Sequence, residues 1–211
     1  MERRELIKMI ALVTGGAVIG GEFFLSGCKN PRAGASAMTF TEKDIAFLDE
    51  VAETILPKTG SAGAKEAKVG QFMTVWVNDC YPKADQEAFH EGIKKLEELS
   101  QSKNGKSFMD STPEQRRDLL ISLEQVAKDF NKAQREKDQP RYDELKAQNK
   151  DYDFVSSPSH YYTMMKQMTL LGYFTSKEGV TTAQRYVPVP GKYDGSLDYK
   201  KGDKLFAGLG G

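Results

Sequence analysis

The chain has 211 residues, with 30 basic and 30 acidic side chains, so its formal net charge at neutral pH is zero. A neutral chain with ordinary apolar content fits one globular domain, and it lacks the basic surface that phosphate backbones require. Nucleic acid is therefore excluded as a partner.

Residues 1–27 have the organisation of a signal peptide. The paired residues Arg3 and Arg4 are followed by an aliphatic pair and Lys8, which is typical of the twin-arginine export route. An ordinary secretory signal with two adjacent arginines is the alternative, and both routes export the chain. The glycine-rich apolar run that follows is short and contains Glu22, which is not typical of a membrane-spanning helix.

The signal ends in LSGC, which matches a lipobox. In this pattern Cys28 receives a diacylglycerol on its sulfur, and cleavage before Cys28 makes it the new N-terminus. Several acyl chains anchor a protein durably, because each buried methylene contributes about 0.8 kcal/mol. Residues 28–38 are expected to form a lipidated tether and residues 39–211 the folded domain. We therefore expect an exported, membrane-anchored lipoprotein that faces the periplasm.

Apolar side chains recur at helical spacing in five segments of the domain. Thr41 and Asp44 form a capping pair at the start of the first segment, and Pro57 ends it. In the fourth segment, Val126 and Phe130 are expected to extend the buried stripe. The fold class is predicted to be all-α, a single domain of about five helices, over residues 39–57, 69–81, 84–100, 111–130 and 156–176.

Cys80 ends the second helical segment and is the only thiol left once Cys28 is lipidated. A single cysteine outside the cytoplasm has no partner for an internal disulfide. The apolar pattern around Cys80 favours a buried side chain, and an intermolecular disulfide is the alternative.

Two segments lack clear periodicity. Residues 131–154 are mostly charged, with Pro140 in the middle, and are predicted to be a solvated continuation of the helix or a long loop. From Lys177 onward the chain is rich in Gly, Pro and Tyr, which predicts an irregular C-terminal arm.

The arm and the end of the last helical segment carry the composition of a partner interface. Aromatic residues occur beside an arginine, as at interface centres, and prolines with Gly191 stiffen the backbone and lower the entropy cost of docking. An arm that wraps the chain's own helices is the alternative. The predicted interface residues are Tyr173, Phe174, Arg185, Tyr186, Val187, Pro188, Pro190 and Tyr193.

Sequence signatures of catalysis are not found. No glycine-rich nucleotide fingerprint and no haem-attachment motif occur. His90 is expected at the surface beside Glu91, and His160 is expected to pack at a helix start. No catalytic, cofactor-binding or metal-binding residue is predicted in this chain.

Three stretches together resemble the gluconate 2-dehydrogenase subunit 3 family. The resemblance extends from about Phe40 to Phe206, nearly all of the mature domain. It is carried by AETILPKTGSAGAKEAKVGQFM (52–73), LLGYFTSKEG (170–179) and RYVPVPGKYDG followed by YKKGDK (185–195 and 199–204).

The resemblance implies a role in an oxidoreductase complex. Family members are non-catalytic small subunits of membrane-associated, flavin-dependent sugar or sugar-acid dehydrogenases. The large subunit, which is similar to glucose–methanol–choline oxidoreductases, holds FAD, and a cytochrome c subunit often passes electrons to the membrane. The small subunit supplies the export signal and supports maturation of the large one. The lipobox implies that this chain also anchors the complex to the membrane. A free-standing cell-envelope lipoprotein that acts as a binding module is the alternative.

Overall fold

The local sequence around Thr41 determines where the first helix of the domain begins. The computed structural model describes residues 39–189, 191 and 194–207. The Thr41 hydroxyl accepts a hydrogen bond from the Asp44 N–H at 3.2 Å, and the Asp44 carboxylate accepts one from the Thr41 N–H at 2.8 Å. This pair satisfies two backbone donors that a helix start otherwise leaves unpaired. The predicted capping pair is confirmed, and helix α2 spans Glu42–Ile55.

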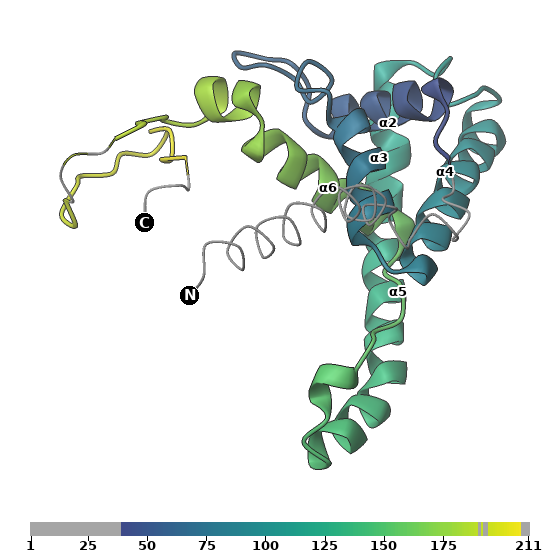
Figure 1. Cartoon of the computed structure of the whole chain (residues 1–211). Helices are drawn as coiled ribbons and strands as arrows, with labels where there is room; N and C mark the ends of the chain where they lie inside the picture. Colours follow the sequence, from purple (N-terminus) through teal and green to yellow (C-terminus); the bar gives the residue numbers. More distant parts are fainter. Residues whose placement is uncertain (1–38, 190, 192–193, 208–211) are drawn as a thin grey trace, which may run out of the picture. The chain divides into compact units, whose positions relative to one another are not determined.

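The prediction of an all-α domain with about five helices and an irregular C-terminal arm is confirmed. The described residues contain five α-helices and two short helical turns, a 3₁₀ turn and a π-helical turn, and their only β-type pairing is an isolated bridge. After α2 the order is α3 (Val69–Cys80), α4 (Lys83–Asn104), α5 (Pro113–Ala147), η1 (Asp151–Asp153), α6 (Tyr161–Thr175) and η2 (Gly179–Ala183), as Figure 1 shows.

Helix α6 is the element around which the core is built. It contacts each of α2, α3, α4 and α5. Its three methionines, Met164, Met165 and Met168, are buried, and such flexible side chains fill irregular gaps between several neighbours. The fully buried side chains contributed by α2, α3 and α4 include Leu48, Val51, Met73, Val77, Phe89 and Leu96.

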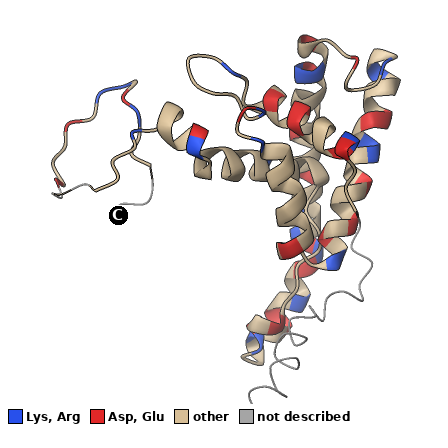
Figure 2. Cartoon of the chain, turned by 45° about the horizontal axis from the view of Figure 1, so that its top comes forward, with Lys and Arg blue, Asp and Glu red and all other residues tan. Residues whose placement is uncertain are grey.

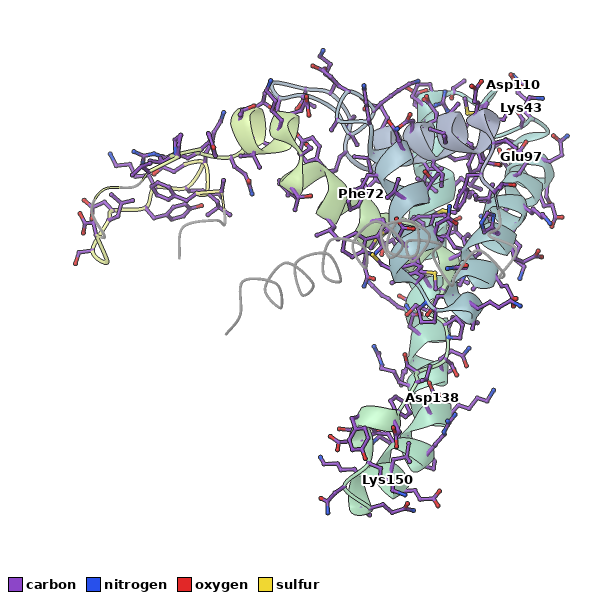
Figure 3. All side chains as sticks on the ribbon, viewed as in Figure 1. Lys43, Phe72, Glu97, Asp110, Asp138 and Lys150 are labelled. Carbon is purple, nitrogen blue, oxygen red and sulfur yellow. The ribbon has the colours of Figure 1, made fainter. Side chains whose placement is uncertain are left out.

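Two glycines allow neighbouring helices to approach α6 closely. A Cβ added to Gly92 of α4 would lie 2.2 Å from the Cβ of Tyr161, and one added to Gly172 of α6 would lie 2.6 Å from Cδ1 of Phe72. Both distances are far shorter than a van der Waals contact between carbon atoms. Figure 3 shows the Phe72 side chain beside α6. The packing of α6 against α3 and α4 therefore depends on these two positions having no side chain.

The buried stripe of α5 is shorter than predicted. Leu119, Leu120 and Leu123 are buried, but Val126 and Phe130 are 53% and 41% exposed. The prediction is wrong for these two positions because helical spacing gives the direction of a stripe, while the neighbouring elements decide how far along the helix it stays covered.

The charged segment that follows is the end of α5 and an irregular return alongside it, which we call the α5 hairpin. Helix α5 continues through Pro140 to Ala147, so of the two predicted alternatives the helix continuation is correct. Asn149 then adopts a left-handed conformation with φ of 55°, which asparagine tolerates better than most residues. The chain returns through η1 and residues 154–160 along α5.

Side-chain hydrogen bonds rather than core packing hold the returning segment of this hairpin. The Asp138 carboxylate accepts hydrogen bonds from the N–H and the hydroxyl of Ser157, at 2.6 and 2.8 Å. The Asn131 side chain accepts one from the His160 N–H and donates one to the Thr163 hydroxyl, both at 2.8 Å. The two hydrogen bonds from Ser157 lower the pKa of Asp138, because they stabilise its charged form.

His160 starts α6, as predicted. Its Nδ1 accepts a hydrogen bond from the Tyr162 N–H at 3.2 Å, and its ring packs against Phe130 and Tyr161. Burial lowers the pKa of His160, and Lys95 shifts it in the same direction. The neutral imidazole is therefore the form that caps the helix.

Charges of both signs are interspersed on the helices. Figure 2 shows basic and acidic residues next to one another along α4 and α5. The pairs Lys83–Glu87 and Lys132–Glu136, each with an N–O distance of 3.8 Å, are exposed and add little stability.

Gly92→Ala tests the close approach of α4 and α6. Alanine is the better helix former by about 1 kcal/mol, yet we expect the free energy of unfolding to fall by about 1–3 kcal/mol because the added methyl group overpacks the interface. Urea unfolding followed by circular dichroism measures the change. Gly60→Ala is the matched control, since a Cβ at Gly60 meets nothing within 4 Å. Wild-type stability of Gly92→Ala would contradict the packing described here.

His160→Asn tests the capping role of the imidazole, because asparagine also caps helices but does not titrate. Since folding lowers the pKa of His160, its stabilising contribution is complete above the unfolded pKa of about 6.5 and is lost as pH falls through that value. We expect the wild type to lose more unfolding free energy than His160→Asn between about pH 7.5 and about pH 5. Parallel pH profiles of the two proteins would refute the prediction.

Candidate functional site

The candidate site consists of the loop between α2 and α3, the end of α6 with η2, and the C-terminal arm. We call the loop, residues 57–68, the base loop. The Glu53 carboxylate, near the end of α2, accepts hydrogen bonds from the N–H groups of Lys58 and Lys65 at 2.8 and 2.9 Å. Gly63 lies against the same carboxylate, since a Cβ there would be 2.3 Å from Glu53 Oε2. This close approach lets a loop outside the helices satisfy its backbone donors.

Two hydrogen bonds at Ala62 tie the base loop to the end of α6 and to η2. The Tyr173 hydroxyl donates to the Ala62 carbonyl at 2.7 Å, and the Ala62 N–H donates to the Thr182 hydroxyl at 3.2 Å. Tyr173 and Ala62 are 111 residues apart in the sequence. The first two stretches that carry the family resemblance therefore meet at this point.

Tyr173 is buried and connects α6 to the base loop, so it is not a surface residue. Its side chain is only 3% exposed, so the prediction that it lies on the partner surface is wrong. The predicted helix is present as α6, but the base loop lies against the face that carries Tyr173, where the Ala62 carbonyl accepts a hydrogen bond from its hydroxyl. Phe174, the next residue, stays at the surface.

The arm, residues 185–207, folds back so that its two ends lie side by side, as the yellow end of the chain shows in Figure 1. The Arg185 N–H donates to the Leu205 carbonyl at 2.8 Å, and the Ala207 N–H donates to the Arg185 carbonyl at 3.1 Å. The Arg185 guanidinium lies 4.7 Å from the centroid of the Phe206 ring, which is a cation–π contact. We call these contacts between Arg185 and residues 205–207 the clasp.

The C-terminal end of the arm is also hydrogen-bonded to η2. The Lys204 ammonium donates a hydrogen bond to the Thr182 carbonyl at 2.6 Å. Thr182 also receives the hydrogen bond from the base loop. The third stretch of the family resemblance thus reaches the place where the first two meet.

Large apolar side chains of the arm remain open to solvent. Exposed apolar patches mark interaction sites more often than ordinary surface. The residues, which are between 39% and 81% exposed, are Tyr186, Val187, Val189, Leu197, Tyr199, Leu205 and Phe206.

The predicted interface residues of the arm are at the surface where the structure describes them. Arg185, Tyr186, Val187 and Pro188 are all exposed, and their contact with a partner stays a prediction. The sequence interpretation missed the apolar residues on the return half of the arm, although the same mixture of aromatic and aliphatic side chains among glycines and lysines could have indicated them. The predicted residues outside the described part of the chain are Pro190, Tyr193, Arg3, Arg4, Lys8 and Cys28.

The folded arm forms a cavity of about 530 Å³ that is partly open to solvent. A cavity of this volume is large enough to hold an organic group. Its walls combine apolar and charged side chains from Arg185, Leu197, Asp198, Tyr199, Asp203, Lys204, Leu205 and Phe206.

A charge cluster joins α2, the base loop and α5. The Glu50 carboxylate pairs with the Lys65 ammonium at 2.8 Å and with the Arg116 guanidinium. Burial lowers the pKa of Arg116. Burial also raises the pKa of Asp49, although its carboxylate accepts a hydrogen bond from the Gly70 N–H at 2.7 Å. Each carboxylate is engaged by a donor of this chain, so the cluster has a structural role.

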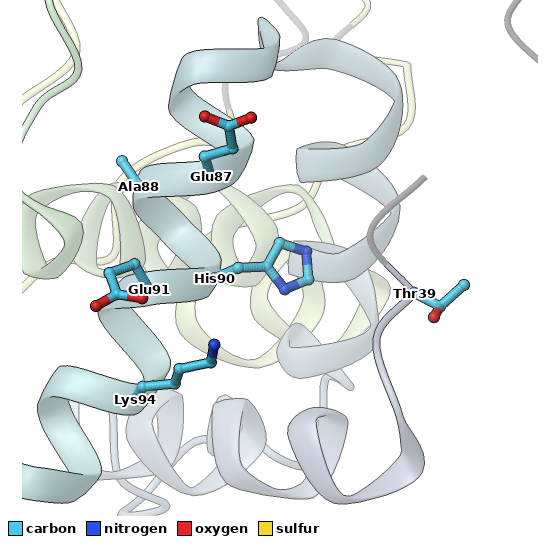
Figure 4. Close-up of a pocket in the computed structure, with 6 residues that line it drawn as sticks. All are labelled: Thr39, Glu87, Ala88, His90, Glu91 and Lys94. Atoms are coloured by element: carbon cyan, nitrogen blue, oxygen red, sulfur yellow. The ribbon is translucent and has the colours of Figure 1, made fainter. Parts of the chain in front are cut away.

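His90 is half-buried and lines a hollow open to solvent beside Glu91, so the predicted surface position is confirmed in part. Its ring stacks on Phe40 with the centroids 4.0 Å apart. Figure 4 shows the hollow beside it, lined by Thr39, Glu87, Ala88, His90, Glu91 and Lys94. Within the described residues, no three His, Cys, Asp or Glu side chains are grouped so that they could hold a metal ion.

Cys80 is exposed at the last residue of α3. The prediction of a buried thiol is therefore wrong. Val69, Met73 and Val77 form the buried face of the helix, and α3 ends at Cys80 before another element covers the side chain. An intermolecular disulfide at Cys80 stays a prediction.

Comparison with protein-family models gives one match, to the model described as gluconate 2-dehydrogenase subunit 3, over residues 42–191. The chain belongs to this family. The match includes the base loop, α6 and η2 and ends at Gly191, within the arm. Comparisons with curated proteins and with solved structures give no significant match. No helix in the described part of this subunit 3 family member is long and apolar enough to cross a membrane.

Tyr173→Phe tests the tie between α6 and the base loop. Loss of the hydroxyl leaves the Ala62 carbonyl without this donor, which should lower the free energy of unfolding by about 0.5–1.5 kcal/mol. Amide hydrogen exchange should become faster in the base loop, residues 57–68. Tyr199→Phe is the matched control, because Tyr199 is an exposed tyrosine of the arm. Equal base-loop exchange in Tyr173→Phe and the wild type would show that the hydrogen bond does not hold the loop.

Proposed function

We propose that this chain is the non-catalytic small subunit of a flavin-dependent sugar or sugar-acid dehydrogenase complex. It accompanies a large catalytic subunit of the glucose–methanol–choline type through export and maturation. It then holds that subunit at the membrane through the lipid on Cys28, facing the periplasm. With this anchor, a cytochrome c subunit serves electron transfer rather than attachment.

The observation that carries the proposal is the exposed apolar arm in a chain whose family is named as a dehydrogenase subunit. A subunit needs a surface for the rest of its complex, and apolar side chains left open to solvent supply one. The base loop, α6 and η2 support this surface through Ala62 and Thr182.

The described residues do not fit FAD as a cofactor of this chain. A dinucleotide is held by a glycine-rich turn between a parallel strand and a helix. The described part of the chain consists of helices, turns and one isolated bridge, so it offers no such turn. The two histidines have roles in packing and capping. The proposal therefore places FAD in the large subunit.

Shared export explains why a small chain would carry a twin-arginine signal. This route moves proteins that are already folded, and a flavoprotein that takes up FAD in the cytoplasm must cross the membrane in that state. A complex of the two chains needs only one signal, which Arg3 and Arg4 supply.

Purification of the tagged full chain from its native membrane is the test. We expect an FAD-containing protein to copurify with the wild type. Substitution of lysine for both Arg3 and Arg4 should leave this flavoprotein in the cytoplasm, because the shared signal is lost. Cys28→Ala should release both chains from the membrane without blocking their export.

Two results would contradict the proposal. Recovery of the wild-type chain alone under mild conditions would favour a free-standing lipoprotein. Normal export of the flavoprotein beside the double lysine variant would show that the two chains do not share a signal.

A further inference from the structure

The cavity in the arm depends on the clasp. The residues that line it come from both ends of the arm, Arg185 from one and Lys204, Leu205 and Phe206 from the other. Separation of Arg185 from Phe206 would therefore take apart the lining. The intervening residues that line the cavity are Leu197, Asp198, Tyr199 and Asp203.

The lining of the cavity combines apolar side chains with balanced charge, Arg185 and Lys204 against Asp198 and Asp203, and it lies within a segment that is basic overall. Its four large apolar side chains, Leu197, Tyr199, Leu205 and Phe206, are each between 48% and 69% exposed, so this chain leaves much of their surface uncovered. Residues 185–207 contain five basic and three acidic side chains, which leaves two net positive charges. The complementary group is apolar and has acidic neighbours.

We propose that the closed arm is a socket that receives an apolar side chain of the catalytic subunit, and that the clasp must be closed for this binding. The inference rests on the proposed function and adds a binding mode to it. The inserted side chain contacts Leu197, Tyr199 and Phe206, while acidic residues around it face the basic side chains of the arm.

Two features favour a protein side chain over a free metabolite. Pockets for small molecules enclose most of the ligand surface, whereas the apolar walls of this cavity are about half open. The arm also exposes apolar side chains that do not line the cavity, at Tyr186, Val187 and Val189, as expected for an interface that extends beyond a central anchor residue.

The clasp gives the socket its shape before the partner arrives. A segment that is already closed loses less conformational entropy on binding than an open one. The Arg185 and Phe206 side chains are therefore positioning residues for the interface, in addition to any contact of their own.

Copurification measures the binding. Leu197→Asp puts a charge on the socket wall and leaves the clasp residues intact, whereas Phe206→Ala opens the clasp and removes a wall. We expect each variant, as a tagged full chain in its native membrane, to retain about tenfold less flavin per chain than the wild type. Val155→Asp is the matched control, since Val155 is an exposed apolar residue on the α5 hairpin, and it should retain wild-type flavin.

Limited trypsin digestion measures the clasp without a partner. Cleavage after Lys200 and Lys201, followed by mass spectrometry on the purified chain, reports opening of the arm. Arg185→Ala and Phe206→Ala should be cleaved roughly two- to fivefold faster than the wild type, as loss of a cation–π contact predicts. Leu197→Asp should be cleaved at the wild-type rate.

The outcomes separate this inference from the proposed function. Wild-type flavin retention by Leu197→Asp and Phe206→Ala would overturn the socket while leaving the subunit role intact. Unchanged cleavage of both clasp variants would overturn the role of the clasp, whatever the partner does. Absence of any flavoprotein with the wild type would refute the proposed function, and the socket with it.

Discussion

The base loop imposes the constraint on which the functional region depends. Ala62, Gly63 and Ala64 are buried, yet they lie outside any helix, so their polar backbone groups need partners that secondary structure does not supply. For Ala62, Tyr173 of α6 donates to the carbonyl and Thr182 of η2 accepts from the N–H, while Glu53 of α2 accepts from the N–H groups of Lys58 and Lys65 in the same loop. Because the partners come from separate elements, satisfying the loop also fixes how these elements meet.

The arm is connected to this region but is only marginally stable as a closed unit. Closing a chain of about twenty residues costs roughly 3 kcal/mol of entropy. An exposed cation–π contact returns about 0.5–1 kcal/mol and each of two backbone hydrogen bonds about 0.5–1.5 kcal/mol. The hydrogen bond from Lys204 to Thr182 adds to these gains, so the closed arm is favoured by a small margin and the loss of one contact shifts the balance toward the open arm. This is a favourable property for a segment that we propose is completed by another protein.

Local signals in the sequence predicted the helices well. They could not predict which distant segments of the chain lie against each other. The Thr41–Asp44 pair and His160 act within a few residues, so their roles could be identified from spacing alone. Tyr173 and Cys80 were misplaced because burial depends on which element lies opposite, and periodicity contains no such information. The arm could be recognised as exposed from its composition, but the pairing of Arg185 with Phe206 joins residues that no local pattern connects.

The α5 hairpin has a consequence for engineering. Hydrogen bonds to Asp138 and Asn131, rather than core packing, hold its returning segment against α5. Its tip at residues 148–150 is exposed. Exposed loop tips of this kind accept insertions with little effect on folding. A reporter placed there leaves both ends of the chain free. That matters in a protein for which we propose an export signal at the beginning and whose end carries the arm.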